Sequence, residues 1–145
     1  DDYTPNPDYY VGLLFHRLMG DAVLDVRAHV AGSSTQGSET LRAYAHCARN
    51  TSGVILLLIN FDMAGTFALD LGGLSPVEQT GRHIWRLTAH SFLDRTVMLN
   101  GKALEPGPNG ALSDMLPTTV PDADTIILAP GTVAFLALPN ALGCK

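Results

Sequence analysis

The chain has 145 residues, 46% of them apolar, and its 9 lysine and arginine residues against 14 aspartate and glutamate residues give a net charge of −5. This length suits about one domain with a buried core. The charge argues against a surface for nucleic acid or heparin-like polyanions, which are bound by clustered basic side chains. The longest wholly apolar run, Val54 to Ile59, is far shorter than the roughly 20 residues of a membrane-spanning helix, which excludes a membrane span.

The chain begins with Asp1, and no leader-like segment follows, which indicates a processed chain or a piece of a longer one. It has two cysteines, Cys47 and Cys144, and one glycosylation sequence, Asn50-Thr51-Ser52. A bond between the cysteines would close a loop of roughly 100 residues and add about 4–5 kcal/mol of stability. Two unrelated buried thiols are the alternative. Together, the cysteine pair and the glycosylation sequence indicate a secretory or lysosomal protein.

The first expected element is a helix over residues 6–19. Asn6 is a favoured N-cap, Pro7 suits the first helical position, and Gly20 is expected to end the helix. Apolar residues recur within it at three- and four-residue spacing, namely Val11, Leu14, Phe15 and Leu18. This stripe predicts an amphipathic helix that packs against a partner surface.

From Ala22 onward, apolar residues recur at every second position, as in strands. The run from Gly53 to Phe61 suits a strand covered on both faces, and Asn100-Gly101 between apolar runs predicts a type I′ hairpin. We expect about eight short strands, within residues 22–30, 41–47, 53–61, 66–71, 81–89, 96–104, 124–128 and 132–138. Residues 32–40 and 105–121 are expected to be surface loops. The predicted fold is mainly β, an antiparallel two-sheet β-sandwich preceded by one helix.

No arrangement of residues predicts a catalytic, metal or cofactor site. The sequence has no G-x-S-x-G nucleophile turn, and its five histidines lack the short spacings of a zinc site. His46 beside Cys47 is interpreted as a solvent-facing strand histidine next to a buried cysteine. Trp85 and Tyr44 are interpreted as core or half-core aromatics rather than sugar-stacking platforms. The acidic residues, interpreted as solvated charges rather than a glycosidase pair, include Asp25, Asp62, Asp70, Glu78, Asp94 and Glu105.

Six stretches, which together cover essentially the whole chain, resemble one known family. They are TPNPDYY at residues 4–10, LLFHRLMG at 13–20, LRAYAHC at 41–47, LLIN at 57–60, VMLNGKAL at 97–104, and VAFLALP at 133–139 with Cys144 behind it. These stretches resemble heparanase and the plant heparanase-like proteins, the β-glucuronidases of glycoside hydrolase family seventy-nine. Members of this family are retaining glycosidases in which a (β/α)8 barrel with two catalytic glutamates is followed by a β-sandwich.

The resemblance implies that residues 1–21 are the end of a barrel loop and the last barrel helix, and that residues 22–145 are the C-terminal β-sandwich. The catalytic glutamates would then precede Asp1. The resemblance also implies a Cys47–Cys144 disulfide, no cofactor, and a glycan substrate bound only through the barrel of the parent enzyme, which is the expected partner. Such an enzyme would be secreted, lysosomal or vacuolar. Tyr3 is expected at the substrate rim, since loops after barrel strands lie on the catalytic face.

The favoured hypothesis is therefore the non-catalytic C-terminal part of a heparanase-like β-glucuronidase. Its substrates would be glucuronic-acid-containing glycans such as heparan sulfate or plant proteoglycan chains. Residues 32–40 contain no lysine or arginine, whereas mammalian heparanase has a basic cluster in this region, so a plant-type glycan is at least as well supported. The alternatives are a stand-alone sandwich that binds carbohydrate through exposed Tyr44 or Trp85, and one that binds another protein through an exposed apolar patch.

Overall fold

The computed structural model describes residues 5–27, 39–71, 81–91, 93–107, 111, 114–121, 125–139, 141, 143 and 144. One helix precedes the strands, and none of the described helical segments is long and apolar enough to cross a membrane. The elements are α1 (Pro7–Leu18), β1 (Met19–Leu24), β2 (Leu41–Ala48), β3 (Val54–Asn60), β4 (Phe67–Asp70), β5 (Arg82–Thr88), β6 (Met98–Leu99), β7 (Lys102–Ala103), β8 (Thr118–Val120), β9 (Thr125–Leu128) and β10 (Val133–Leu138).

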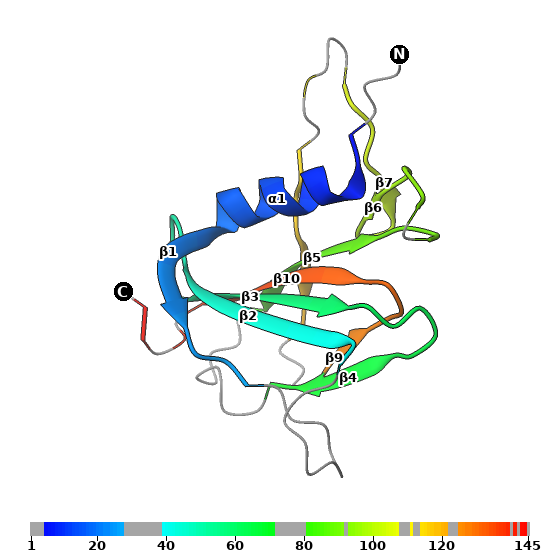
Figure 1. Cartoon of the computed structure of the whole chain (residues 1–145). Coiled ribbons are helices and arrows are strands. Elements are labelled where there is room, and N and C mark those ends of the chain that lie inside the picture. The colour runs from blue at the N-terminus through cyan, green and yellow to red at the C-terminus, as the bar shows by residue number, and fades with distance from the viewer. Residues whose placement is uncertain are drawn as a thin grey trace.

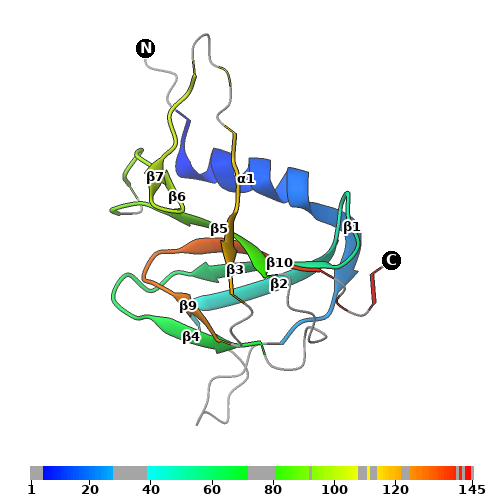
Figure 2. The same cartoon turned by 180° about the vertical axis from the view of Figure 1, so that it is seen from behind.

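The strands form one large and one small antiparallel sheet. The large sheet has the order β1-β2-β3-β10-β5-β6-β7, with β8 also paired to β5, and the small sheet pairs β4 with β9. In Figure 1, α1 lies across one face of the large sheet and the β4–β9 pair lies on the other side, and Figure 2 shows the same layers from behind. The predicted antiparallel β-sandwich with one preceding helix is confirmed, although its two sheets are very unequal in size.

Strands β3 and β10 lie in the middle of the large sheet and are apolar on both faces. Leu56 and Leu136 pack with residues of β4–β9 in the core between the sheets. Their sequence neighbours Leu57 and Phe135 point to the other face and pack with residues of α1 in a second core. The prediction of a strand covered on both faces is therefore confirmed for β3.

The apolar side of α1 packs on the large sheet. Tyr10 is 4% exposed and Leu14 is 1% exposed, and burial of each such side chain contributes about 1.5–3 kcal/mol. Phe15, which belongs to the predicted stripe, is instead 39% exposed. Asn6 is the N-cap residue as predicted, but its side chain makes no capping hydrogen bond. The partner surface that the stripe requires is thus the chain's own sheet.

The predicted stop at Gly20 is wrong, because α1 ends at Leu18 and Gly20 lies inside β1. A Cβ atom on Gly20 would lie 2.8 Å from the carbonyl oxygen of Cys47. Glycine is therefore used here for a close approach between β1 and β2 rather than for a helix end. The strand predicted over residues 22–30 begins earlier, at Met19, and ends at Leu24, while residues 28–30 lie outside the described part of the chain.

Of the turn and loop predictions, the hairpin is confirmed and one loop is wrong at its end. Asn100 and Gly101 have φ angles of 49° and 82°, as a type I′ turn requires. Within the loop predicted over residues 105–121, residues Thr118–Val120 form β8 and pair with β5. This short, mostly exposed strand is held by backbone pairing and leaves little periodicity in the sequence. Residues 32–38 of the other predicted loop lie outside the described residues.

A disulfide joins Cys47 at the end of β2 to Cys144, with a Cα–Cα distance of 5.3 Å. The two cysteines are 97 residues apart in the sequence. The bond therefore ties the last residues of the chain to the large sheet.

Asn60, which is 1% exposed at the end of β3, fastens the small sheet to the large one. Its Nδ2 group donates hydrogen bonds to the carbonyl oxygens of Gly65 at 2.8 Å, Leu128 at 3.3 Å and Ala129 at 2.9 Å. Its Oδ1 atom accepts a hydrogen bond from the backbone N–H of Asp62 at 2.9 Å. One side chain thus serves both the loop after β3 and the end of β9.

We predict that Asn60→Ala lowers the free energy of unfolding by about 2–3 kcal/mol, because it removes the partner that Asn60 provides to buried and partly buried backbone groups. Urea unfolding of the unglycosylated chain measures this. The matched control is Asn50→Ala in an exposed turn, which should change the stability by less than about 0.5 kcal/mol. Equal effects of the two substitutions would contradict the role assigned to Asn60.

Candidate functional site

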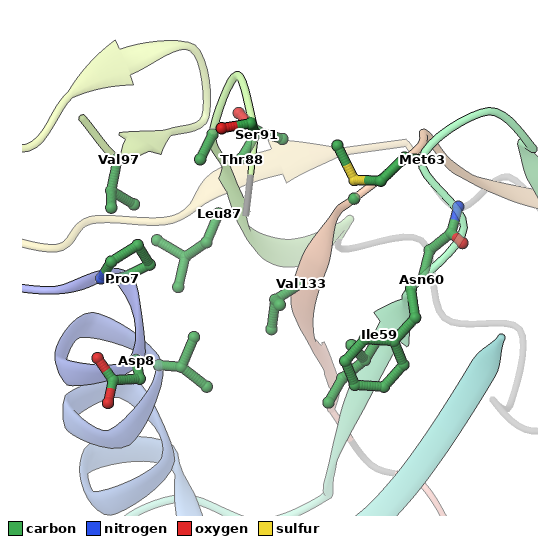
Figure 3. Close-up of a pocket in the computed structure, with 14 residues that line it drawn as sticks. Pro7, Asp8, Ile59, Asn60, Met63, Leu87, Thr88, Ser91, Val97 and Val133 are labelled. Atoms are coloured by element: carbon green, nitrogen blue, oxygen red, sulfur yellow. The ribbon is translucent and has the colours of Figure 1, made fainter. Parts of the chain in front are cut away.

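A hollow of about 190 Å³ lies between the start of α1 and one end of the large sheet. In Figure 3, Pro7 of α1 lies across this hollow from Ile59 of β3 and Val133 of β10, and Leu87 of β5 lies between them. Phe61 and Met63, from the loop after β3, add apolar side chains that are 49% and 43% exposed. The hollow is thus lined mainly by apolar side chains.

The polar groups of the hollow do not form a catalytic arrangement. Among its described lining residues, Asp8 is the one carboxylate, whereas a glycosidase needs two facing carboxyl groups. The Asn60 amide is engaged with backbone carbonyls. The hollow can therefore accept apolar surface, but it lacks the acid pair for glycoside cleavage.

Two acidic residues have pKa values shifted in the wrong direction for a general acid, which at neutral pH needs a raised pKa. Asp62 accepts hydrogen bonds from the backbone N–H groups of Ala64 at 2.8 Å and Gly65 at 2.9 Å, and these bonds lower its pKa. Asp94 accepts from the backbone N–H of Thr96 at 2.9 Å, which is the main cause of its lowered pKa. Both carboxylates therefore stabilise turns.

The other acidic candidates are surface groups where the structure describes them. Asp25 forms an exposed ion pair with Arg27, with 3.4 Å between the charged atoms. Asp70 and Glu105 are exposed, and Glu78 lies outside the described residues. Among the residues that the structure places, no group of three His, Cys, Asp or Glu side chains could hold a metal ion.

Of the two aromatic candidates for sugar stacking, one is buried and one is exposed. Trp85 is 7% exposed and its Nε1–H donates a hydrogen bond to the carbonyl oxygen of Met115 at 2.9 Å. Trp85 is therefore a core residue, as predicted. The interpretation of Tyr44 as a core or half-core residue is wrong, because Tyr44 on β2 is 48% exposed, which is the exposure that the alternative of a carbohydrate-binding sandwich requires.

Three candidate residues remain, namely His46, Tyr3 and Asn50, and none of them is shown to take part in a site. The Nδ1 atom of His46 lies 2.7 Å from the carbonyl oxygen of Gly20, and its ring packs edge-on against Phe15. His46 is half-buried rather than solvent-facing, because α1 and β1 pack beside it. Tyr3, the predicted substrate-rim residue, lies outside the described residues, and Asn50 is exposed in the turn between β2 and β3.

The hollow itself was not foreseen from the sequence. Phe61 and Met63 are the available signal, because they are apolar residues in a connection between strands, where polar residues are usual. The residues that face them come from α1, β5 and β10, and only the fold brings these elements together.

We predict that acid lowers the stability partly through Asp62. A carboxylate with a lowered pKa in the folded state contributes stability above its unfolded-state pKa, and the contribution is lost as the pH falls through the folded-state pKa. Asp62→Asn keeps an acceptor oxygen but cannot be protonated. Between about pH 5 and pH 3 its melting temperature should therefore fall less than that of the unsubstituted chain. The exposed control Asp114→Asn should not reproduce this effect, and parallel acid profiles for all three proteins would contradict the prediction.

The sequence matches no protein-family model, but it is similar to several known proteins. It is 30% identical to Heparanase-like protein 1 of Arabidopsis thaliana, over 95% of this chain and 30% of that protein. It is 30% identical to Baicalin-beta-D-glucuronidase of Scutellaria baicalensis, over 95% of this chain and 25% of that protein. It is 29% identical to Inactive heparanase-2 of Homo sapiens, over 99% of this chain and 26% of that protein. The chain thus spans between a quarter and a third of the length of these relatives. Similarity along nearly its whole length makes the chain a relative of the heparanase-like proteins, as its motifs predicted.

Proposed function

We propose that this chain is the C-terminal, non-catalytic β-sandwich portion of a heparanase-like retaining β-glucuronidase. The observation that carries the proposal is that nearly all of this chain matches only 25–30% of each relative. The hollow beside α1 offers one described carboxylate, Asp8, where a retaining glycosidase needs two. The chemistry would therefore belong to the rest of such an enzyme.

The names of the relatives support a non-catalytic role. One relative is named a glucuronidase and another is named inactive, yet the chain is 30% and 29% identical to them over at least 95% of its length. The portion that this chain represents is thus shared by a named enzyme and by a protein named inactive. We infer that this shared portion supports the fold rather than carrying the reaction.

In this proposal a catalytic barrel is the partner, and the barrel alone binds the substrate. The substrate would be a glucuronic-acid-containing glycan such as heparan sulfate or a plant proteoglycan chain, with Tyr3 at the rim of its site. The enzyme would be secreted, lysosomal or vacuolar. The Cys47–Cys144 disulfide supports such a location, because disulfides persist in oxidising compartments.

The outward side of α1 is the surface that we assign to the barrel. Tyr10 and Leu14 face the large sheet, whereas Tyr9 is 45% exposed. Gly12 is also exposed, and a Cβ atom added there would have no atom within 4 Å beyond its chain neighbours and the backbone of its own helix. Glycine in a helix interior costs about 1 kcal/mol relative to alanine but allows a second element to approach closely. In the proposed arrangement α1 lies between the sheet and the barrel, and Gly12 allows the barrel to approach the helix closely. In the isolated chain no described element packs against Gly12, so its cost to the helix has no compensation.

The test compares the isolated chain with the longer polypeptide encoded by the same gene. The isolated chain should hydrolyse no glucuronide substrate, and the longer polypeptide should hydrolyse it. Turnover by the purified chain alone would overturn the proposal.

The same pair of proteins tests the role of α1 through Gly12→Ala. In the isolated chain the substitution should raise the free energy of unfolding by about 0.5–1 kcal/mol, because alanine is the better helix former and the space is open. In the longer enzyme the added methyl group would meet the barrel, so the melting temperature should fall. An equal gain in both proteins would show that this side of α1 stays in solvent.

A further inference from the structure

The turn between β2 and β3 presents a glycosylation sequence to solvent. Residues 49–53 connect the two strands, and Asn50, Thr51 and Ser52 within it are all exposed. N-linked glycosylation modifies asparagine in Asn-x-Ser/Thr on surface segments of secretory proteins. We propose that Asn50 carries an N-linked oligosaccharide and that this end of the large sheet stays open to solvent in the longer enzyme.

Hydrogen bonds at the base of the turn hold it in place without using the Asn50 side chain. The backbone N–H of Ala48 donates to the carbonyl oxygen of Gly53 at 2.9 Å, and that of Arg49 donates to Leu18 at 2.9 Å. The Nε–H of Arg49 also donates to the carbonyl oxygen of Met19 at 3.1 Å. None of these bonds uses the side chain of Asn50, so a glycan there disrupts none of them.

The neighbouring disulfide places this turn in a suitable compartment. Cys47 lies just before Asn50, and its bond to Cys144 forms in oxidising compartments such as the one in which N-glycosylation occurs. Because Cys144 follows Cys47 by 97 residues, Asn50 is synthesised long before the bond can close. The turn is therefore accessible to modification before the disulfide ties the sheet to the end of the chain.

The glycan would lie at the opposite end of the sheet from the hollow. Strand β3 runs from Val54, beside the turn, to Asn60, which lines the hollow. Helix α1 begins at the hollow with Pro7 and ends with Leu18, which is bonded to the turn, and Figure 1 shows the two ends well separated. A branched oligosaccharide at Asn50 would keep protein away from its end of the sheet. This part of the inference rests on the proposed function, and it leaves the outward side and the start of α1 free for the barrel.

The reaction that attaches the glycan takes an oligosaccharide from a lipid diphosphate donor. The bond between the sugar C1 atom and the phosphate oxygen breaks, and a bond forms between C1 and Nδ2 of Asn50. The lipid diphosphate leaves and Nδ2 loses one proton. The third residue of the sequence, Ser52, supplies the hydroxyl that the acceptor sequence requires.

The experiment expresses the full chain behind a cleavable signal peptide in secreting eukaryotic cells and analyses its peptides by mass spectrometry. We expect a glycan on Asn50 that peptide-N-glycosidase removes. Ser52→Ala should abolish the glycan, whereas Ser52→Thr and the control Thr51→Ala should retain it. A secreted chain with the Cys47–Cys144 bond formed and Asn50 unmodified would overturn the proposal.

The longer enzyme tests the position of the glycan separately. Asn50 should be glycosylated there as well, and removal of the glycan from the native enzyme should leave glucuronide turnover unchanged. An active longer enzyme with Asn50 unmodified, next to an isolated chain with Asn50 glycosylated, would show that the barrel covers this end. Because glycosylation of the isolated chain does not depend on turnover, its result stands even if the longer polypeptide has no glucuronidase activity.

Discussion

The structure depends on covering both faces of the β3–β10 pair. These strands align from Val133 opposite Ile59 to Leu138 opposite Val54, and buried apolar side chains alternate to the two sides of the sheet. A sheet with two apolar faces is stable in water only between two covering layers. Helix α1 provides one layer and the β4–β9 pair provides the other, and Asn60 fastens the β4–β9 layer at its edge.

The two covering layers also explain where the chain can meet a partner. The inner side of α1 is occupied by the chain's own sheet, so the described surface left for the proposed barrel is the outward side of α1 and the apolar hollow at its start. Tyr9 is exposed on α1, and Phe61 and Met63 are exposed at the hollow; exposed apolar groups of this kind mark interaction surfaces where they form a patch. The opposite end of the sheet carries the polar turn with Asn50. The molecule thus has one end suited to burial and one suited to solvent.

Sequence patterns correctly predicted the elements whose structure depends mainly on residues close together in the chain. The apolar run of β3 and the Asn100-Gly101 turn needed no knowledge of distant residues. By contrast, Gly20 was interpreted as a helix end because glycine is common there, whereas its role comes from the approach of Cys47. The predicted helical stripe included Phe15 and left out Tyr10, whereas Tyr10 is the buried one of the two, because it packs in the core between α1 and the large sheet. The Asn60 site was not predictable, since its bond to Leu128 spans 68 residues.

Native-state hydrogen exchange tests most directly whether α1 and the central strands form one cooperative unit in this chain. We predict that the amides of Leu14 in α1, Leu57 in β3 and Leu136 in β10 exchange at similar slow rates, through unfolding of the whole domain. Fast exchange at Leu14 with continued protection at Leu57 and Leu136 would contradict this. Such a result would mean that the helix does not stably cover the sheet in the chain alone.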